Sequence, residues 1–347
     1  MGFTAEYGLF LAKCVTLVVA VLAIVIFIVS QRSKAKQSPG ELVIREPGKE
    51  YKQLQKRLEQ ALIEPTAQKL LLKTEKQKEK TRIKEEKQQA KAGTFAVKPV
   101  LFLLSFKGSM DAHEVETLRK EVSAVLSAAK PGDEVLLKLE SPGGVVHGYG
   151  LAASQLQRFR DHGIPLTAVV DKVAASGGYM MACVANHIVA APFSIIGSIG
   201  VVAQIPNIHR LLKKNDIDVE LHTAGQYKRT LTMLGENSEE GRDKFRQDLD
   251  ETHQLFKAFV SDMRPSLDID SVATGEHWYG KQALEKGLID EIATSDAWII
   301  ERMQQFRLLS LSYARRKTFI ERFTQSGATA VEKAALKLWQ RGQKPLL

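Results

Sequence analysis

The chain has 347 residues, 44% of them hydrophobic and 26% charged, enough for one large domain or two small ones with a buried core. The formal charge of +9 would suit a nucleic-acid-binding protein, but residues 31–92 carry 17 Lys and Arg against 9 Asp and Glu, so the rest of the chain is near neutral. We therefore expect no nucleic-acid partner. Cys14 and Cys183 lie in apolar runs without zinc-binding spacing, so they do not fix the redox compartment.

Residues 9–29, "LFLAKCVTLVVAVLAIVIFIV", carry a single charge, Lys13. A helix of ~20 residues crosses a hydrocarbon core of ~30 Å, so this run predicts a transmembrane anchor within residues 1–30 that contacts membrane lipid. A cleaved signal peptide is the alternative. It is disfavoured because the run is long and the following "IVSQR" lacks a small-residue cleavage site.

Residues 31–95 are expected to form a basic stalk, helical or disordered. Tyr51, Leu54, Leu58 and Leu62 recur at helical spacing before Pro65 interrupts the pattern. Residues 69–92 follow as a run rich in Lys, Glu and Gln. Such a stalk either attracts anionic lipid or remains solvated, and the second interpretation is favoured because charge runs usually keep a helix in water.

The texture changes at residue 96, where a globular domain is expected to begin and to extend to residue 305. Apolar runs predict strands, and amphipathic segments between them predict helices. We expect strands at 97–106, 133–141, 164–171, 187–192 and 197–204, and helices at 112–129, 148–161 and 177–186. This alternation predicts an α/β fold with parallel strands, whose ligands gather at the carboxyl ends of the strands.

Two glycine turns fall at such strand ends, "SPGG" at 141–144 and "ASGG" at 175–178. Ser176 ends a strand and opens a helix, which makes it a candidate nucleophile. Acyl transfer needs two N–H donors for the oxyanion, and the Gly177 N–H is well placed to be one. The second is expected from Gly143 or Gly144, since both permit an N–H to point into a cleft.

A nucleophilic serine needs a base. His147, in "GGVVHGYG", is the histidine nearest to the proposed cleft, and Lys228, in "HTAGQYKRTLTMLGE", is a lysine that interrupts an uncharged stretch. A lysine serves as a base near neutral pH only where burial favours its neutral form. The local pattern does not decide between the two.

The motifs "SPGG", "DKVAASGGYMMA", "GSIGVV", "AGQYKRT" and "GEHWYGKQALEKGLIDE" resemble those of the signal peptide peptidase A family of membrane serine proteases. The resemblance covers the anchor, the stalk and the globular part. It implies a Clp/crotonase-type spiral fold and a Ser-Lys dyad. By matching position, Ser176 is the nucleophile, Lys228 the general base, and Ser198 a hydroxyl that orients the lysine. Gly143 and Gly177 supply the oxyanion hole.

The resemblance also implies a single-pass endopeptidase of the bacterial inner membrane that cleaves signal peptides or other membrane-associated polypeptides without a cofactor or metal. With one copy of the motifs, the chain is expected to form a homo-oligomer in which neighbours contribute the serine and the lysine. The family places its catalytic domain outside the cytoplasm, whereas Arg32, Lys34 and Lys36 after the span favour the opposite orientation.

Two other functions are compatible with parts of this pattern. A crotonase-like acyl-CoA enzyme would share the two-donor oxyanion site but has no need for Ser176 with Lys228. A catalytically silent membrane scaffold would not need the full set of dyad residues. Residues 306–347 are expected to form a basic C-terminal extension with an ordinary amphipathic helix.

Overall fold

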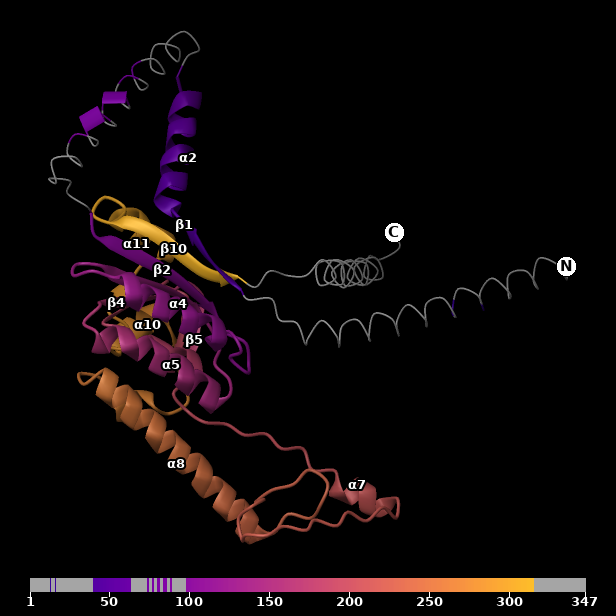
Figure 1. Cartoon of the computed structure of the whole chain (residues 1–347). Coiled ribbons are helices and arrows are strands. Elements are labelled where there is room, and N and C mark those ends of the chain that lie inside the picture. The colour runs from indigo at the N-terminus through magenta and orange to yellow at the C-terminus, as the bar shows by residue number, and fades with distance from the viewer. Residues whose placement is uncertain are drawn as a thin grey trace, which may run out of the picture. The chain divides into compact units, whose positions relative to one another are not determined.

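The computed structural model describes residues 40–63 and 98–314, together with the isolated residues 13, 16, 74, 77, 80, 81, 84, 85 and 88. The described residues between 42 and 313 belong to one compact unit (Figure 1). Among the described residues, no helix has the length and apolar character needed to cross a bilayer. The anchor expected within residues 1–30 lies outside the described residues except for Lys13 and Thr16, as does the chain beyond residue 314.

The main sheet has seven strands in the order β1-β10-β2-β3-β4-β6-β9. Every pair from β10 to β9 is parallel. The bounds are β1 (Glu41–Arg45), β10 (Arg307–Ala314), β2 (Val100–Lys107), β3 (Glu134–Glu140), β4 (Leu166–Val170), β6 (His187–Ala190) and β9 (Glu291–Ile292). The predicted α/β class with parallel strands is therefore confirmed.

Both faces of this sheet are covered. Along β3, Leu136 packs into one hydrophobic cluster with Trp298, while Leu137 packs into the other with Leu118 and Leu156. Alternate residues of a strand point to opposite faces, which explains why the central strands read as unbroken apolar runs. The helices are α2 (Pro47–Ala61), α4 (Val115–Ala128), α5 (Val146–Asp161), α6 (Gly177–Ala182), α7 (His209–Lys214), α8 (Glu239–Met263), α9 (Ile269–Val272), α10 (Gly280–Glu285) and α11 (Ser295–Arg302).

A second sheet of three short strands lies beside the first. It comprises β5 (Val173–Ala175), β7 (Ile195–Gly197) and β8 (His277–Tyr279). Strand β5 pairs parallel with β7, and β7 pairs antiparallel with β8. An isolated bridge from Ser141 to Ala174 joins the end of β3 to β5, so the small sheet continues from the carboxyl edge of the large one.

The main sheet extends past both ends expected for the globular domain. Strand β1 lies within the segment expected as a stalk, and β10 lies within the expected C-terminal extension. Leu308 and Leu311 of β10 are buried, which explains its place inside the sheet. The basic residues that follow β10 in the sequence hide this short apolar pattern.

The strand predicted over residues 197–204 is wrong. Strand β7 ends at Gly197, because Gly197 and Ser198 both have positive φ, 99° and 52°, and turn the chain out of the sheet. From residue 201 to residue 238 the chain extends away from the sheets and returns as α8 (Figure 1). We call residues 201–238 the arm.

Candidate active site

Two serines lie at the ends of neighbouring parallel strands. Ala175 of β5 is paired with Gly197 of β7, and Ser176 and Ser198 are the residues that follow. The Ser176 N–H donates to the Gly197 carbonyl oxygen over 2.8 Å. The register of the small sheet therefore places the predicted nucleophile and the predicted orienting hydroxyl at the same edge.

Both serines hold an unusual backbone conformation. Ser176 and Ser198 each have φ of 52°. For a residue with a side chain, this left-handed region costs on the order of 1–3 kcal/mol and persists only where the surroundings impose it. Here the pairing of β5 with β7 imposes it, and it presents Ser176 at the start of α6.

Glycines bring the backbone close to Ser176. A Cβ atom at Gly143 would lie 2.7 Å from Ser176 Cβ, and one at Gly177 would lie 2.4 Å from Tyr149 Cγ. Gly143 also has φ of 91°, which glycine adopts readily. The turn "SPGG" therefore packs directly against the turn "ASGG", as expected for two halves of one site.

A buried hydrogen-bond chain supports the first of these turns. The Gly143 N–H donates to Ser141 Oγ over 3.1 Å, and Ser141 Oγ lies 2.5 Å from the Tyr149 hydroxyl oxygen. The Tyr149 hydroxyl in turn donates to the Ser109 carbonyl oxygen over 2.8 Å. Since Tyr149 has one hydroxyl proton, Ser141 must donate its own to Tyr149. Burial raises the pKa of Tyr149, so the phenol remains neutral.

The same chain bears on the oxyanion donors. In this structure the Gly143 N–H is directed at Ser141, while the N–H of the adjacent Gly144 has no acceptor among the described residues. Sequence reasoning missed Ser141 and Tyr149. A serine directly before a Pro-Gly-Gly turn and a tyrosine eight residues later were the available signals.

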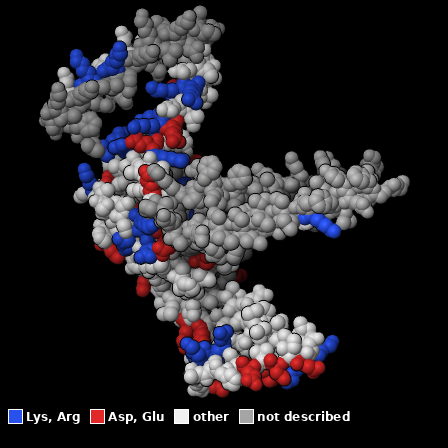
Figure 2. All heavy atoms as spheres, turned by 45° about the vertical axis from the view of Figure 1, so that its right-hand side comes forward, with Lys and Arg blue, Asp and Glu red and all other residues white. Residues whose placement is uncertain are grey.

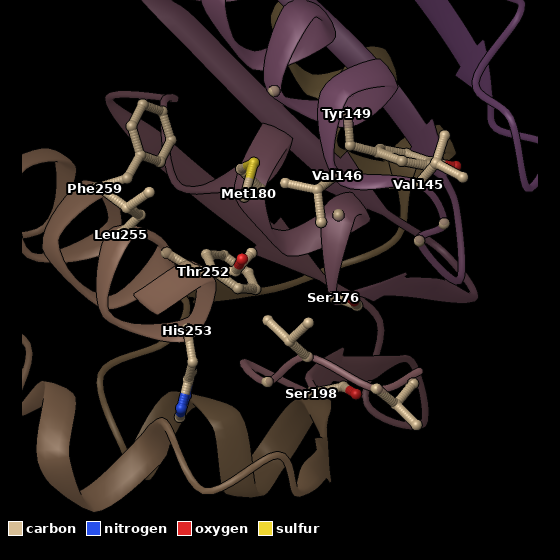
Figure 3. Close-up of a pocket in the computed structure, with 18 of the residues that line it drawn as sticks. Val145, Val146, Tyr149, Ser176, Met180, Ser198, Thr252, His253, Leu255 and Phe259 are labelled. Atoms are coloured by element: carbon tan, nitrogen blue, oxygen red, sulfur yellow. The ribbon is translucent and has the colours of Figure 1, made fainter. Parts of the chain in front are cut away.

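A cavity of about 970 Å³ opens beside Ser176. Gly143, Gly177 and Ser198 line it together with Ser176. Figure 3 shows the two serines on one side, with Met180, Leu255 and Phe259 gathered on another. The cavity therefore joins a polar edge, where an acyl group would react, to an apolar space.

Neither candidate base lines this cavity. Lys228 lies on the arm, where its side chain is exposed. Its backbone N–H donates to the Gly225 carbonyl oxygen over 3.2 Å. His147 is exposed at the start of α5. The structure thus brings Ser176, Ser198 and the glycines together within one chain but not Lys228.

The arm exposes many apolar side chains for a segment of a folded protein. Val202 is 91% exposed and Leu211 is 59% exposed. The others are Ile205, Ile208, Ile217, Val219, Leu221, Tyr227, Met233 and Leu234. Figure 2 shows a broad area of uncharged residues, bordered by acidic and basic ones, at this end of the molecule. Large exposed apolar patches are rare on folded proteins and are typical of surfaces that bind a partner.

The chain matches characterised protein families along most of its length. The model described as "Peptidase family S49 N-terminal" matches residues 2–156, and the one described as "Peptidase family S49" matches residues 158–309. A Haemophilus influenzae protein named "Probable protease SohB" is 51% identical over 320 residues, which cover 91% of each chain.

A protein of the same name from Buchnera aphidicola subsp. Schlechtendalia chinensis is 53% identical over 305 residues, which cover 87% of this chain and 100% of the relative. Among solved structures, a variant of the membrane-bound stomatin-specific protease 1510-N in complex with a substrate peptide covers 66% of this chain at 13% identity. The aligned region covers 100% of that protease's chain, and the TM-score is 0.42.

Proposed function

The chain belongs to peptidase family S49 and is a serine protease, and we propose that it cleaves polypeptides with Ser176 as nucleophile and Lys228 as general base. The observation that carries the assignment of the nucleophile is the register of the small sheet, whereas the role of Lys228 is supported by the family resemblance. This register holds Ser176 and Ser198 at adjacent strand ends, against two glycine turns and beside an apolar cavity.

In the proposed reaction, neutral Lys228 removes the hydroxyl proton of Ser176 as its oxygen attacks the scissile carbonyl. The protonated amine then donates this proton to the leaving amine, and water hydrolyses the acyl-enzyme with Lys228 again acting as base. Ser198 follows Gly197 at the strand end beside that of Ser176. In the proposed reaction it accepts a hydrogen bond from the amine and orients it.

We assign the Gly177 N–H as one oxyanion donor, because it adjoins Ser176 at the start of α6 and the macrodipole of a helix favours negative charge there. The second donor comes from the "SPGG" turn. Gly143 packs against Ser176, and its N–H must turn from Ser141 toward the substrate oxygen to serve, whereas the Gly144 N–H is already free of an acceptor among the described residues.

We propose that a second copy of the chain completes the site. A lysine is a base only when its amine is neutral, which burial favours, and Lys228 is exposed in the single chain. The exposed apolar side chains of the arm support packing of the arm against a neighbouring subunit. Lys228 would then lie beside the Ser176 of that neighbour.

The family and the sequence support three further proposals. We propose that residues 9–29 anchor the enzyme in the bacterial inner membrane, that the catalytic unit adopts the spiral arrangement of Clp-type proteases, and that its substrates are signal peptides or other membrane-associated polypeptides. The apolar cavity supports substrates with large hydrophobic side chains.

Co-expression of two inactive variants tests the dyad and its sharing together. Ser176→Ala and Lys228→Ala are each expected to abolish peptide hydrolysis, and mixed oligomers of the two should recover activity because some sites pair an intact serine with an intact lysine. Hydrolysis of a fluorogenic peptide by the purified proteins is the measurement. Substantial activity in either single variant would remove the dyad. Two inactive variants with no recovery on mixing would place both groups in one chain.

A further inference from the structure

The loop that carries Ser198 is held mainly by backbone hydrogen bonds. The Ser198 N–H donates to the Glu276 carbonyl oxygen over 2.6 Å, and the Gly275 N–H donates to the Ile199 carbonyl oxygen over 3.1 Å. Together with the hydrogen bond from the Ser176 N–H to the Gly197 carbonyl oxygen, these contacts hold residues 197–200 next to the nucleophile.

Among the described residues, a single side chain forms a hydrogen bond with this loop. His253 Nε2 lies 3.3 Å from the Ile199 carbonyl oxygen, and the half-buried His253 ring lines the cavity. Since a carbonyl oxygen only accepts, Nε2 must carry a proton.

The place of this contact in the chain gives it significance. The arm starts at residue 201, two residues after Ile199, and ends where α8 begins. His253 lies in the middle of α8, whose C-terminal half is anchored in the core by Phe256 and Val260. The hydrogen bond therefore joins the residues just before the arm to α8, the helix that follows the arm. We call residues 199–200 the root of the arm.

We infer that His253 is a positioning residue for the proposed Ser-Lys chemistry, acting through the Ile199 carbonyl on Ser198 and on the root of the arm. The inference rests on the proposed function. His253 makes no proton transfer itself. It holds the loop of Ser198 and the base of the arm that carries Lys228 in one fixed relation, so that the hydroxyl and the amine meet their targets. Figure 3 shows Ser198 and His253 among the residues that surround the cavity.

Two substitutions in the full-length chain distinguish the effect of the N–H donor of His253 from the effect of its aromatic ring. His253→Phe keeps an aromatic ring and removes the donor, whereas His253→Gln keeps an N–H donor at similar reach. We expect His253→Phe to lower kcat by about 10-fold to 10²-fold with KM unchanged, because small misplacements of reacting groups slow the chemical step. His253→Gln should restore most of kcat.

His162→Phe is the matched control, because His162 also bonds a backbone carbonyl, that of Arg158, but on an exposed surface. It should retain wild-type kcat. His253→Ala replaces the Phe variant if that one does not fold. Wild-type kcat in the donor-less variant, or equal impairment in His253→Gln and His253→Phe, would overturn the inference. Activity retained by Ser176→Ala would instead overturn the proposed function, whatever the His253 variants do.

Discussion

At the scale of single residues, the site depends on groups that never touch substrate in the proposed reaction. Ser141 is fully buried, and its hydroxyl connects the turn that holds Gly143 to the phenol of Tyr149. Polar groups buried in this way are stable only while each has its partner, because an unpaired one loses its hydration without compensation. The geometry of the "SPGG" turn is therefore tied to one tyrosine hydroxyl.

Tyr149→Phe removes that hydroxyl and leaves Ser141 Oγ and the Ser109 carbonyl without it. We expect the free energy of unfolding to fall by about 1–3 kcal/mol, the usual cost of an unsatisfied buried polar group. Urea denaturation of the variant and of wild type measures this difference in the free energy of unfolding. Tyr227→Phe is the control, since among the described residues its hydroxyl donates only to the exposed Glu240, and it should change stability by less than ~0.5 kcal/mol. Equal stability of the Tyr149 variant and wild type would contradict this account.

At the scale of elements, strand β10 is held to α4 by a buried carboxyl group. Glu121 is 3% exposed, and its Oε1 accepts the Tyr313 N–H over 2.7 Å. The other oxygen, Oε2, has no hydrogen-bond partner among the residues that the structure describes. Burial raises the pKa of Glu121 above its ordinary value of 4.5, and the bond from Tyr313 opposes this shift only in part.

A raised pKa means that the folded state prefers the protonated acid. The stability that Glu121 contributes is then fully present below pH 4.5 and is lost as the pH rises through the folded-state pKa. Glu121→Gln keeps an oxygen acceptor for Tyr313 and does not titrate. We therefore expect the stability of the variant relative to wild type to increase as the pH rises from 4.5 through the folded-state pKa of Glu121 and then to level off, measured as the free energy of unfolding in a pH series. A difference independent of pH would rule out this role.

The elements also show what the sequence can and cannot predict. Strands β2, β3 and β4 were predictable because burial on both faces leaves unbroken apolar runs. Strand β1 was not, since an edge strand of five residues with charged ends leaves only a short apolar signature. The apolar residues after Gly197 suggested a continuing strand, yet a backbone turn at Ser198 decided the path.

For the candidate site, local motifs could predict that the serine and the glycine turns lie together, because each lies where its own strand ends. They could not predict the hydrogen bond from His253 to Ile199, which joins residues 54 positions apart. Nor could they place Lys228, whose surroundings in the proposed enzyme belong to another chain. Its assignment came from the family resemblance, and its burial remains a prediction.

At the scale of the whole molecule, a shared dyad makes activity a property of the assembly. If Lys228 is the base, as proposed, a chain that keeps Ser176 in its own cavity and exposes Lys228 on the arm has no complete site in isolation. Specific activity is then expected to fall as the enzyme is diluted below the concentration at which subunits dissociate. Peptide hydrolysis measured across a dilution series, alongside sedimentation velocity, tests this. Constant specific activity in demonstrably monomeric enzyme would exclude a shared site.

The pairing of Ala175 with Gly197 also limits which changes of length the chain can tolerate. An inserted or deleted residue within β5 or β7 would advance one serine relative to the other and turn its side chain to the opposite face. The connection between these strands runs through α6 and β6, and its turn at residues 192–193, where Phe193 is exposed, meets no such restriction. Natural length differences among relatives should therefore fall in that turn and spare the two triplets of residues that precede the serines.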